Sequence, residues 1–337
     1  MIQKFLLRFL FLAIVVLQSA CDKKEEAGLH SIYQLDKYNP NKPIISLDKE
    51  WVRQVVKSFP QGIEWYKTEK KVGSKPARMS LLVFRPSKGV ELKPVLSTTA
   101  KTPSTFFEEE AGTVYAAMNA GFFSGSTSLS LVMQNSVVGS VNVKSLTRPL
   151  NGVNTTYYPT RAAFGLTGLL VPSVSWVYSV GAGNGTLYSY PQPSSNEVGK
   201  APLVVPSALF PLGGEVWDVA TAIGGSPMLI KDSKINITDV NELIAVDNTS
   251  SRARSAIGYL KNGNVVLLAV EGGNPETSPG LNLAEVADEM LAIGCVGAIN
   301  LDGGGSSSLV VNGEQTIKPS DTGGERKVIS ALIVKKK

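Results

Sequence analysis

The part of this chain best suited to chemistry is a carboxylate followed by a run of small residues. Asp302 ends the apolar segment 298–301 and precedes three glycines, Gly303–Gly305, and then Ser306. Glycine allows positive φ angles and close approach of a ligand to the backbone, and successive backbone N–H groups can form an anion-binding nest. The pattern therefore predicts an acid beside an anion site. A tight β-turn with a polar rim is the alternative, and the spacing alone does not separate the two.

The low number of histidines restricts the possible catalytic chemistry further. The chain has one histidine, His30, close to its N-terminus. A Ser-His-Asp triad would need His30 to fold back from a predicted tether, and a zinc site built from several histidines is excluded. No Lys-Ser or Lys-Thr follows a G-x-x-x-x-G pattern, so the glycines do not form a P-loop. Acid–base catalysis must use carboxylates, tyrosines or lysines.

Length and composition indicate a folded protein that does not bind nucleic acid. A chain of 337 residues suits one large domain or two small ones. Apolar residues make up 43% and charged residues 18%, which is enough for a sizeable core. The formal net charge is +5, but the basic residues are scattered, without the clustered stripe typical of nucleic-acid binding.

The N-terminal region resembles an export signal. Residues 1–20 begin with basic residues and continue into the apolar run 9–17, which is too short to span a bilayer comfortably. Cys21 follows two small residues, as in a bacterial lipobox, although Gln18 is not the leucine preferred at its position. We expect an exported lipoprotein of the bacterial cell envelope, anchored to the membrane through a lipid on Cys21, with residues 21–45 as a polar tether. An ordinary signal peptide cut nearby is the alternative.

Mostly β-structure is expected to position the acids. The segments 254–260 and 265–270 predict a hairpin with Asn262-Gly263 as a two-residue turn. Asn282 and Glu285 form a capping-box pattern ahead of an apolar helical face, which predicts a helix, and a further short helix is expected at 49–57. The class is therefore α+β, a mostly antiparallel sheet with few helices in a single catalytic domain, residues 46–337.

Two other features of the sequence, segment 146–215 and Cys295, are best explained by structural roles. Residues 146–215 contain few charges and many Ser, Gly, Pro and Tyr residues, which suggests a β-rich insertion. Its aromatic side chains could stack on sugar rings or simply pack between strands, and packing is the stronger interpretation for each one. Cys295 lies in an apolar segment and is expected to be a buried, inert thiol without a disulfide partner.

Seven short motifs occur in an order that resembles the phosphodiester glycosidase family over roughly residues 78–337. In chain order they are Asn119-Ala-Gly-Phe-Phe, Arg161-Ala-Ala-Phe-Gly, Ala222-Ile-Gly-Gly-Ser-Pro-Met-Leu, Arg254-Ser-Ala-Ile-Gly, Gly280-Leu-Asn-Leu-Ala-Glu, Asn300-Leu-Asp-Gly-Gly-Gly-Ser-Ser and Gly324-Glu-Arg-Lys-Val. The block that contains Asp302 is the most specific. Three positions depart from the family pattern: Ala120 replaces a glycine, Glu271 replaces an aspartate, and Gly273 replaces an arginine.

The resemblance implies cleavage of the bond between sugar C1 and the oxygen of a phosphodiester. Reactions with an oxocarbenium-like transition state usually employ two carboxylates, and the candidates here are Asp302 and Glu271, each at the end of a predicted strand. Each acid alone could instead cap a turn. Because phosphate is a weak base, stabilising its charge matters more than protonating it.

Charge stabilisation points to a set of substrate-binding candidates. Arg254 is the first choice and Arg326 the second, because a guanidinium is permanently charged and matches phosphate with two parallel hydrogen bonds. Structural ion pairing is the alternative role for both arginines. The remaining candidates are Asn119, Gly303, Gly304, Gly305 and Ser306.

No cofactor is assigned from the sequence. Carboxylate, Asn and Ser oxygens near Asp302 would suit Ca²⁺ or Mg²⁺, but EF-hand spacing is absent, so a divalent cation stays an open alternative. The expected partners are a glycan or sugar-phosphate substrate and the membrane. The predicted function is hydrolysis of a sugar-1-phosphodiester linkage of the GlcNAc-1-phosphate type in envelope or extracellular polysaccharide. The alternatives are an ordinary glycosidase of envelope glycans and a non-catalytic glycan-binding surface lipoprotein.

Overall fold

The structure of the protein is a computed structural model, which describes residues 43–337. The expected signal peptide at 1–20, the lipidation at Cys21, His30 and nearly all of the tether at 21–45 lie outside the described residues. No helix within the described part is long and apolar enough to cross a membrane.

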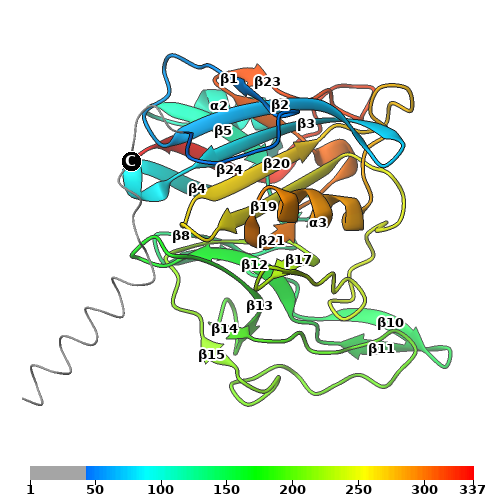
Figure 1. Ribbon diagram of the computed structural model, residues 1–337. Coiled ribbons are helices and arrows are strands. Elements are labelled where there is room, and N and C mark those ends of the chain that lie inside the picture. The colour runs from blue at the N-terminus through cyan, green and yellow to red at the C-terminus, as the bar shows by residue number, and fades with distance from the viewer. Residues whose placement is uncertain (1–42) are drawn as a thin grey trace, which may run out of the picture. The chain divides into compact units, whose positions relative to one another are not determined.

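The described residues form three principal antiparallel sheets and two α-helices, so the predicted α+β class with a mostly antiparallel sheet is confirmed. Figure 1 shows the strands of the eight-stranded sheet above those of the seven-stranded sheet. The eight-stranded sheet has the order β1 (Val52–Gln54), β2 (Ile63–Val72), β3 (Lys75–Phe84), β20 (Val265–Val270), β19 (Arg254–Leu260), β21 (Cys295–Asn300), β17 (Met228–Lys231) and β18 (Lys234–Ile235).

Two further sheets and two short hairpins complete the β-structure. The five-stranded sheet has the order β23 (Glu314–Gln315), β22 (Leu309–Val311), β5 (Val114–Asn119), β24 (Val328–Lys336) and β4 (Val90–Lys101). The seven-stranded sheet has the order β15 (Glu215–Val216), β14 (Thr186–Tyr190), β13 (Pro172–Val180), β12 (Arg161–Leu166), β16 (Thr221–Gly224), β8 (Val132–Gln134) and β9 (Val137–Ser140). The hairpins are β6 (Phe123–Ser124) with β7 (Thr127–Ser128), and β10 (Leu146–Leu150) with β11 (Val153–Tyr157).

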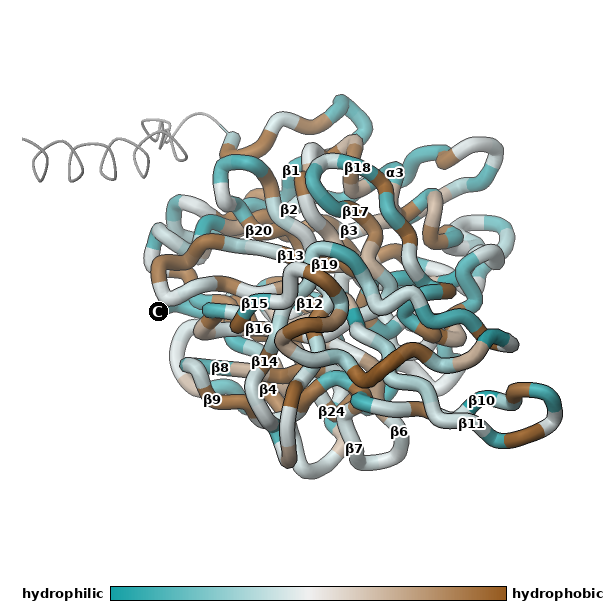
Figure 2. The backbone as a smooth tube through the Cα atoms, turned by 90° about the horizontal axis from the view of Figure 1, so that it is seen from below, coloured by the Kyte–Doolittle hydropathy of each residue, from teal (hydrophilic) through white to brown (hydrophobic). Residues whose placement is uncertain are grey.

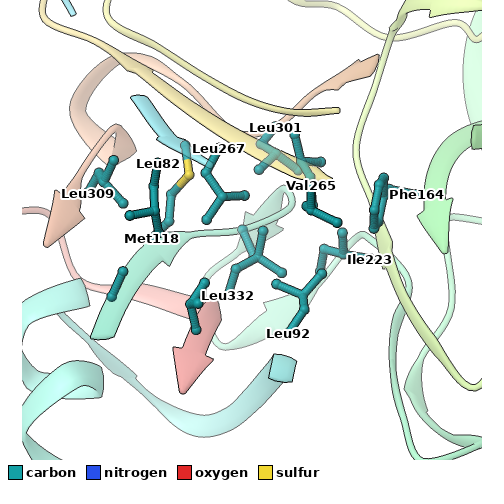
Figure 3. Packing of buried hydrophobic residues seen from close by; sticks show 14 of the residues in the cluster. Leu82, Leu92, Met118, Phe164, Ile223, Val265, Leu267, Leu301, Leu309 and Leu332 are labelled. Atoms are coloured by element: carbon teal, nitrogen blue, oxygen red, sulfur yellow. The ribbon is translucent and has the colours of Figure 1, made fainter. Parts of the chain in front are cut away.

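The largest hydrophobic core lies where the three sheets meet. Figure 3 shows side chains from all three sheets packed against one another: Leu82 and Leu267 from the eight-stranded sheet, Met118 and Leu332 from the five-stranded sheet, and Phe164 and Ile223 from the seven-stranded sheet. All six are fully buried. Removing such apolar surface from water contributes about 25 cal/mol per Å². The shared core therefore holds the loops at the sheet edges in a defined arrangement.

The local predictions have mixed outcomes. The helix is confirmed as α3 (Leu283–Ala292), with Asn282 and Glu285 forming a complete capping box. The hairpin of β19 and β20 is confirmed, but its turn is wrong: Leu260 N donates to Asn264 O at 2.9 Å, closing a three-residue loop in which Gly263 takes φ 80°. This matches a type I turn followed by a glycine bulge. The helix expected at 49–57 is also wrong, because Val52–Gln54 pairs with β2 as a strand.

The remaining elements are the other helices. They are α2 (Pro103–Glu109) and the 3₁₀ turns η1 (Pro86–Lys88) and η2 (Gly304–Ser306). Thr102 caps α2, because its hydroxyl accepts from Thr105 N at 3.1 Å.

Segment 146–215 supplies strands β10 to β15, and β12 and β13 lie inside the seven-stranded sheet. Figure 2 shows the β10–β11 hairpin projecting beyond the other strands. Tyr157, Trp176 and Tyr190 are at most 1% exposed, so these aromatic side chains pack within the fold and cannot stack on a sugar. Cys295 is a buried free cysteine, and burial raises the pKa of its thiol, as an inert thiol requires.

Candidate active site

Antiparallel pairing brings the candidate residues to one edge of the eight-stranded sheet. Arg254, the first residue of β19, pairs with Val270, the last residue of β20. Ala256 of the same strand pairs with Asn300, the last residue of β21. The start of β19 therefore lies beside the ends of β20 and β21, and the segments that carry Arg254, Glu271 and Asp302 emerge at the same edge.

A cavity of about 620 Å³ opens at this edge. That volume is within the range of small-molecule sites, roughly 300–1,000 Å³. Six of the nine candidate catalytic and substrate-binding residues line it: Arg254, Asp302, Gly303, Gly304, Gly305 and Arg326. Its charged lining consists of three arginines and three aspartates: Arg252, Arg254, Arg326, Asp247, Asp302 and Asp321.

Asp302 is held through its backbone and carries a perturbed carboxyl group. Its N–H donates to Ala120 O at 3.1 Å, and its carbonyl accepts from Asn119 Nδ2 at 2.7 Å. Burial raises the pKa of the Asp302 carboxyl, against opposing effects of the Ser306 hydroxyl, the Gly303 N–H and the charge of Arg326. A carboxylate with a raised pKa is a stronger base than an exposed one, which suits acid–base catalysis.

Arg254 supplies a positive charge that no carboxylate neutralises directly. Its side chain is fixed by backbone carbonyls: Nε donates to Leu281 O at 2.9 Å, and Nη2 donates to Ser250 O at 2.9 Å and to Asp247 O. Within residues 43–337, Nη1 donates no hydrogen bond and no acidic side chain forms an ion pair with Arg254. Burial lowers the pKa of Arg254 to about 10, so the guanidinium remains charged at neutral pH. The arrangement leaves a rigid cation available to an anionic ligand.

The other two arginines of the cavity are ion-paired. Arg326 binds Asp321 with two hydrogen bonds, from Nε at 2.9 Å and from Nη2 at 3.0 Å. A Cβ on Gly305 would lie 2.1 Å from the Nη2 atom of Arg326, so a larger residue at this position would have to displace the pair. Arg252 binds Asp247 at 2.7 Å and 3.1 Å, and these hydrogen bonds lower the pKa of Asp247 to about 2.

The glycine loop offers fewer free donors than the sequence suggested. Gly303 N donates to the Asp302 carboxylate at 2.9 Å, and Gly304 N donates to Ala253 O at 2.8 Å. Among the three glycines, Gly305 alone has an N–H without a partner in the described part of the chain. Ser306 is 1% exposed, and its hydroxyl acts on the Asp302 carboxyl, whose pKa it lowers. The substrate-binding roles of these residues stay predictions.

Asn119 and Glu271 do not line the cavity. Besides holding the Asp302 carbonyl, the Asn119 amide accepts from Ser255 Oγ at 2.7 Å and from Ser308 N at 3.1 Å, so it joins three segments beneath the site. Glu271 is 5% exposed; its Oε2 accepts from Lys318 N at 3.0 Å. The catalytic role of Glu271 stays a prediction, and its observed contacts are those of a residue that anchors a loop.

Sequence reasoning missed six polar residues of the cavity: Asn300, Asp247, Arg252, Asp321, Ser251 and Ser320. Asn300 donates from Nδ2 to Ser226 O at 2.8 Å and to Leu301 O at 2.7 Å, which leaves its buried Oδ1 without a partner. Its place in the most specific motif was the available signal. The two aspartates follow no pattern of their own, since each is identified only by the arginine that it meets.

Comparisons with known proteins show what this chain is similar to. Residues 177–335 match the family model described as phosphodiester glycosidase, which confirms the resemblance seen in the motifs over those residues. N-acetylglucosamine-1-phosphodiester alpha-N-acetylglucosaminidase of Bos taurus is 46% identical over 69 residues, which are 20% of this chain and 13% of that protein. This chain therefore matches only a small part of that relative's length.

Two solved structures share the fold. A hypothetical protein from Synechocystis has a TM-score of 0.55 at 19% identity, over 82% of this chain and 63% of that chain. The catalytic domain of zebrafish N-acetylglucosamine-1-phosphodiester alpha-N-acetylglucosaminidase, auto-inhibited by its pro-peptide, has a TM-score of 0.52 at 17% identity, over 89% of this chain and 85% of that chain. At these identities the likeness concerns the fold alone.

Proposed function

We propose that this protein hydrolyses a sugar-1-phosphodiester linkage, of the GlcNAc-1-phosphate type, in an envelope or extracellular polysaccharide. The main observation behind the proposal is that Asp302 and Arg254 line the same cavity. Asp302 has a carboxyl group with a raised pKa, and Arg254 has a guanidinium without a carboxylate partner among the described residues. A base and a fixed cation are the two groups that this reaction needs most. The match of residues 177–335 to the phosphodiester glycosidase family supports the same reaction.

The proposed mechanism assigns each group a step. The Nη1 atom of Arg254 binds the phosphoryl oxygens and stabilises the negative charge that grows on the leaving phosphate. The Asp302 carboxylate accepts a proton from the water that attacks sugar C1. The electron pair of the C1–O bond departs with the phosphate, so the products are a free sugar and a phosphomonoester.

The change of an arginine to Gly273 bears on the leaving group. Gly273 lines the cavity with φ +81°, where a side chain would be strained. Arg254, which has no carboxylate partner among the described residues, supplies positive charge in the same cavity without it. We infer that the phosphate is still recognised and that the leaving group differs from the one that an arginine at this position would bind.

The test is release of free GlcNAc from an α-GlcNAc-1-phosphate methyl diester by the purified full chain. Asp302→Asn should abolish turnover, whereas the control Asp288→Asn, which changes an exposed aspartate on α3, should retain it. Competitive inhibition by inorganic phosphate would distinguish this activity from an ordinary glycosidase. Binding of the diester without turnover by the wild-type protein would refute the proposal and favour a glycan-binding role.

We also propose that the protein is exported and anchored in the bacterial cell envelope through a lipid on Cys21. The apolar run before Cys21 and the small residues beside it support this. The full chain should partition into the detergent phase of a Triton X-114 extraction, and Cys21→Ala should move it to the aqueous phase. Unchanged partitioning of the variant would refute the anchor.

A further inference from the structure

A second cavity of about 280 Å³ adjoins the first one, and the two share Phe122 and Ala245 as a common wall. Most of its lining is apolar, including Phe123, Leu243 and Ile244. Two arginines, Arg148 and Arg161, also line it, whereas no acidic side chain does. A cavity with apolar walls and two cations suits a ligand that combines an apolar portion with negative charge.

Arg161 shows the clearest signature of a missing ligand. The residue is 8% exposed, its Nε has no hydrogen-bond partner, and its Nη2 reaches only Leu243 O, at 3.3 Å. Burial lowers the pKa of Arg161 to about 10, so the side chain is still a cation at neutral pH. A buried guanidinium with one long hydrogen bond is costly unless another group pairs with it.

The nearest acid does not fill this role. Glu242 influences Arg161 through its charge, but its two oxygens already accept five hydrogen bonds and it forms no ion pair with Arg161 among the described residues. Arg148 lies close enough to lower the Arg161 pKa by repulsion. The repulsion between the two cations would be relieved by one anion between them.

We propose that the second cavity binds the group beyond the phosphate, and that this group carries a second anionic function, a phosphate or a carboxylate, next to an apolar portion. The assignment rests on the proposed function, because it takes the first cavity to hold the sugar phosphate. In this assignment the group beyond the phosphate extends past Phe122, which lines both cavities, into the second cavity. Arg148 and Arg161 bind its charge, and Phe123, Leu243 and Ile244 pack against its apolar part.

Binding of phenyl phosphate, which has an apolar ring and a phosphate, tests the assignment. Calorimetric titrations would use the full chain with saturating GlcNAc-1-phosphate, so that the first cavity is occupied. Arg148→Gln is the informative variant because this arginine is half-buried on β10 and is not needed to satisfy the core. The matched control, Lys71→Gln, removes one positive charge from an exposed position on β2.

We expect phenyl phosphate to bind the wild-type protein and the control equally, and to bind Arg148→Gln about tenfold more weakly, as for loss of one charge-assisted hydrogen bond. Benzoate should show the same dependence if a carboxylate is accepted, and benzyl alcohol should not bind. Equal affinity of Arg148→Gln and wild type, or no binding of phenyl phosphate, would overturn the proposal. Binding that depends on Arg148 in a protein without turnover would preserve this site and refute the proposed hydrolysis.

Discussion

Replacement of Asn119 by alanine gives the sharpest test of how the site is held together. The amide makes three buried hydrogen bonds, to the Asp302 carbonyl at 2.7 Å, the Ser255 hydroxyl at 2.7 Å and the Ser308 N–H at 3.1 Å. Each buried polar group that loses its partner costs about 1–3 kcal/mol. Asn119→Ala should therefore lower the free energy of unfolding by about 3 kcal/mol or more.

The same substitution should reduce turnover in the molecules that remain folded. Asn119 does not line the cavity, so it acts as a positioning residue: without it the Asp302 backbone loses its side-chain anchor, and misplacement by about 1 Å can cost on the order of 100-fold in rate. We expect kcat to fall by roughly 10–100-fold while KM changes little.

Urea unfolding followed by fluorescence measures the first effect, and release of free sugar well below the unfolding midpoint measures the second. The control is Asn154→Ala on β11, an exposed position whose side chain makes no hydrogen bond among the described residues, where a change within about 0.5 kcal/mol is expected. A loss below about 1 kcal/mol in Asn119→Ala, or an unchanged kcat, would refute the reasoning.

Four further outcomes follow from the site. Asp302→Asn should abolish turnover yet raise the melting temperature at pH 7. The pKa of the Asp302 carboxyl is raised above 3.8 in the folded state, so its ionisation makes the folded state less stable as the pH rises above 3.8. The stability gained by Asp302→Asn should therefore vanish below pH 3.8. Gly305→Ala should raise KM severalfold, because its Cβ displaces the ion pair above it. Glu271→Gln should keep kcat within about threefold while lowering the melting temperature, and a loss as deep as that of Asp302→Asn would restore its catalytic assignment. Arg252→Gln should return the Asp247 pKa from about 2 toward 3.8, as measured by an NMR titration. In the wild-type protein the lowered pKa stabilises the folded state above pH 3.8, and this contribution is lost as the pH falls to about 2. The variant should lack that contribution.

Local signals in the sequence predicted the elements whose structure is decided locally. The capping box of Asn282 and Glu285 is contained within four residues, and α3 begins where it indicates. The segments 254–260 and 265–270 on either side of Asn262-Gly263 likewise predicted the hairpin. The turn type failed because Asn262-Gly263 is compatible with two loop geometries, and only Gly263 adopts a positive φ angle.

The composition of the cavity depends on contacts that no local pattern contains. Asp321 and Arg326 are five residues apart in a loop, and their pairing above Gly305 arises from the path of that loop. Glu271 has the same strand-end pattern as Asp302, yet its carboxylate accepts from Lys318 N instead of lining the cavity. Residue type and position predicted that Asp302 and Glu271 each follow a strand, whereas the direction of each side chain required the tertiary structure.

The position of β24 between β4 and β5 has a consequence for how the protein is made. β4 and β5 both pair with β24, so neither pairing can be complete until residue 336 has been synthesised. In the same way, β3 cannot pair with β20 until that strand has been synthesised. At roughly 5–20 residues per second, a ribosome needs on the order of ten to forty seconds to travel from β5 to the end of β24. For that time the apolar faces of β4 and β5 stay exposed and prone to aggregate. A nascent chain that stops before residue 328 lacks the strand that joins them, so the five-stranded sheet is completed only when nearly all of the described sequence is present.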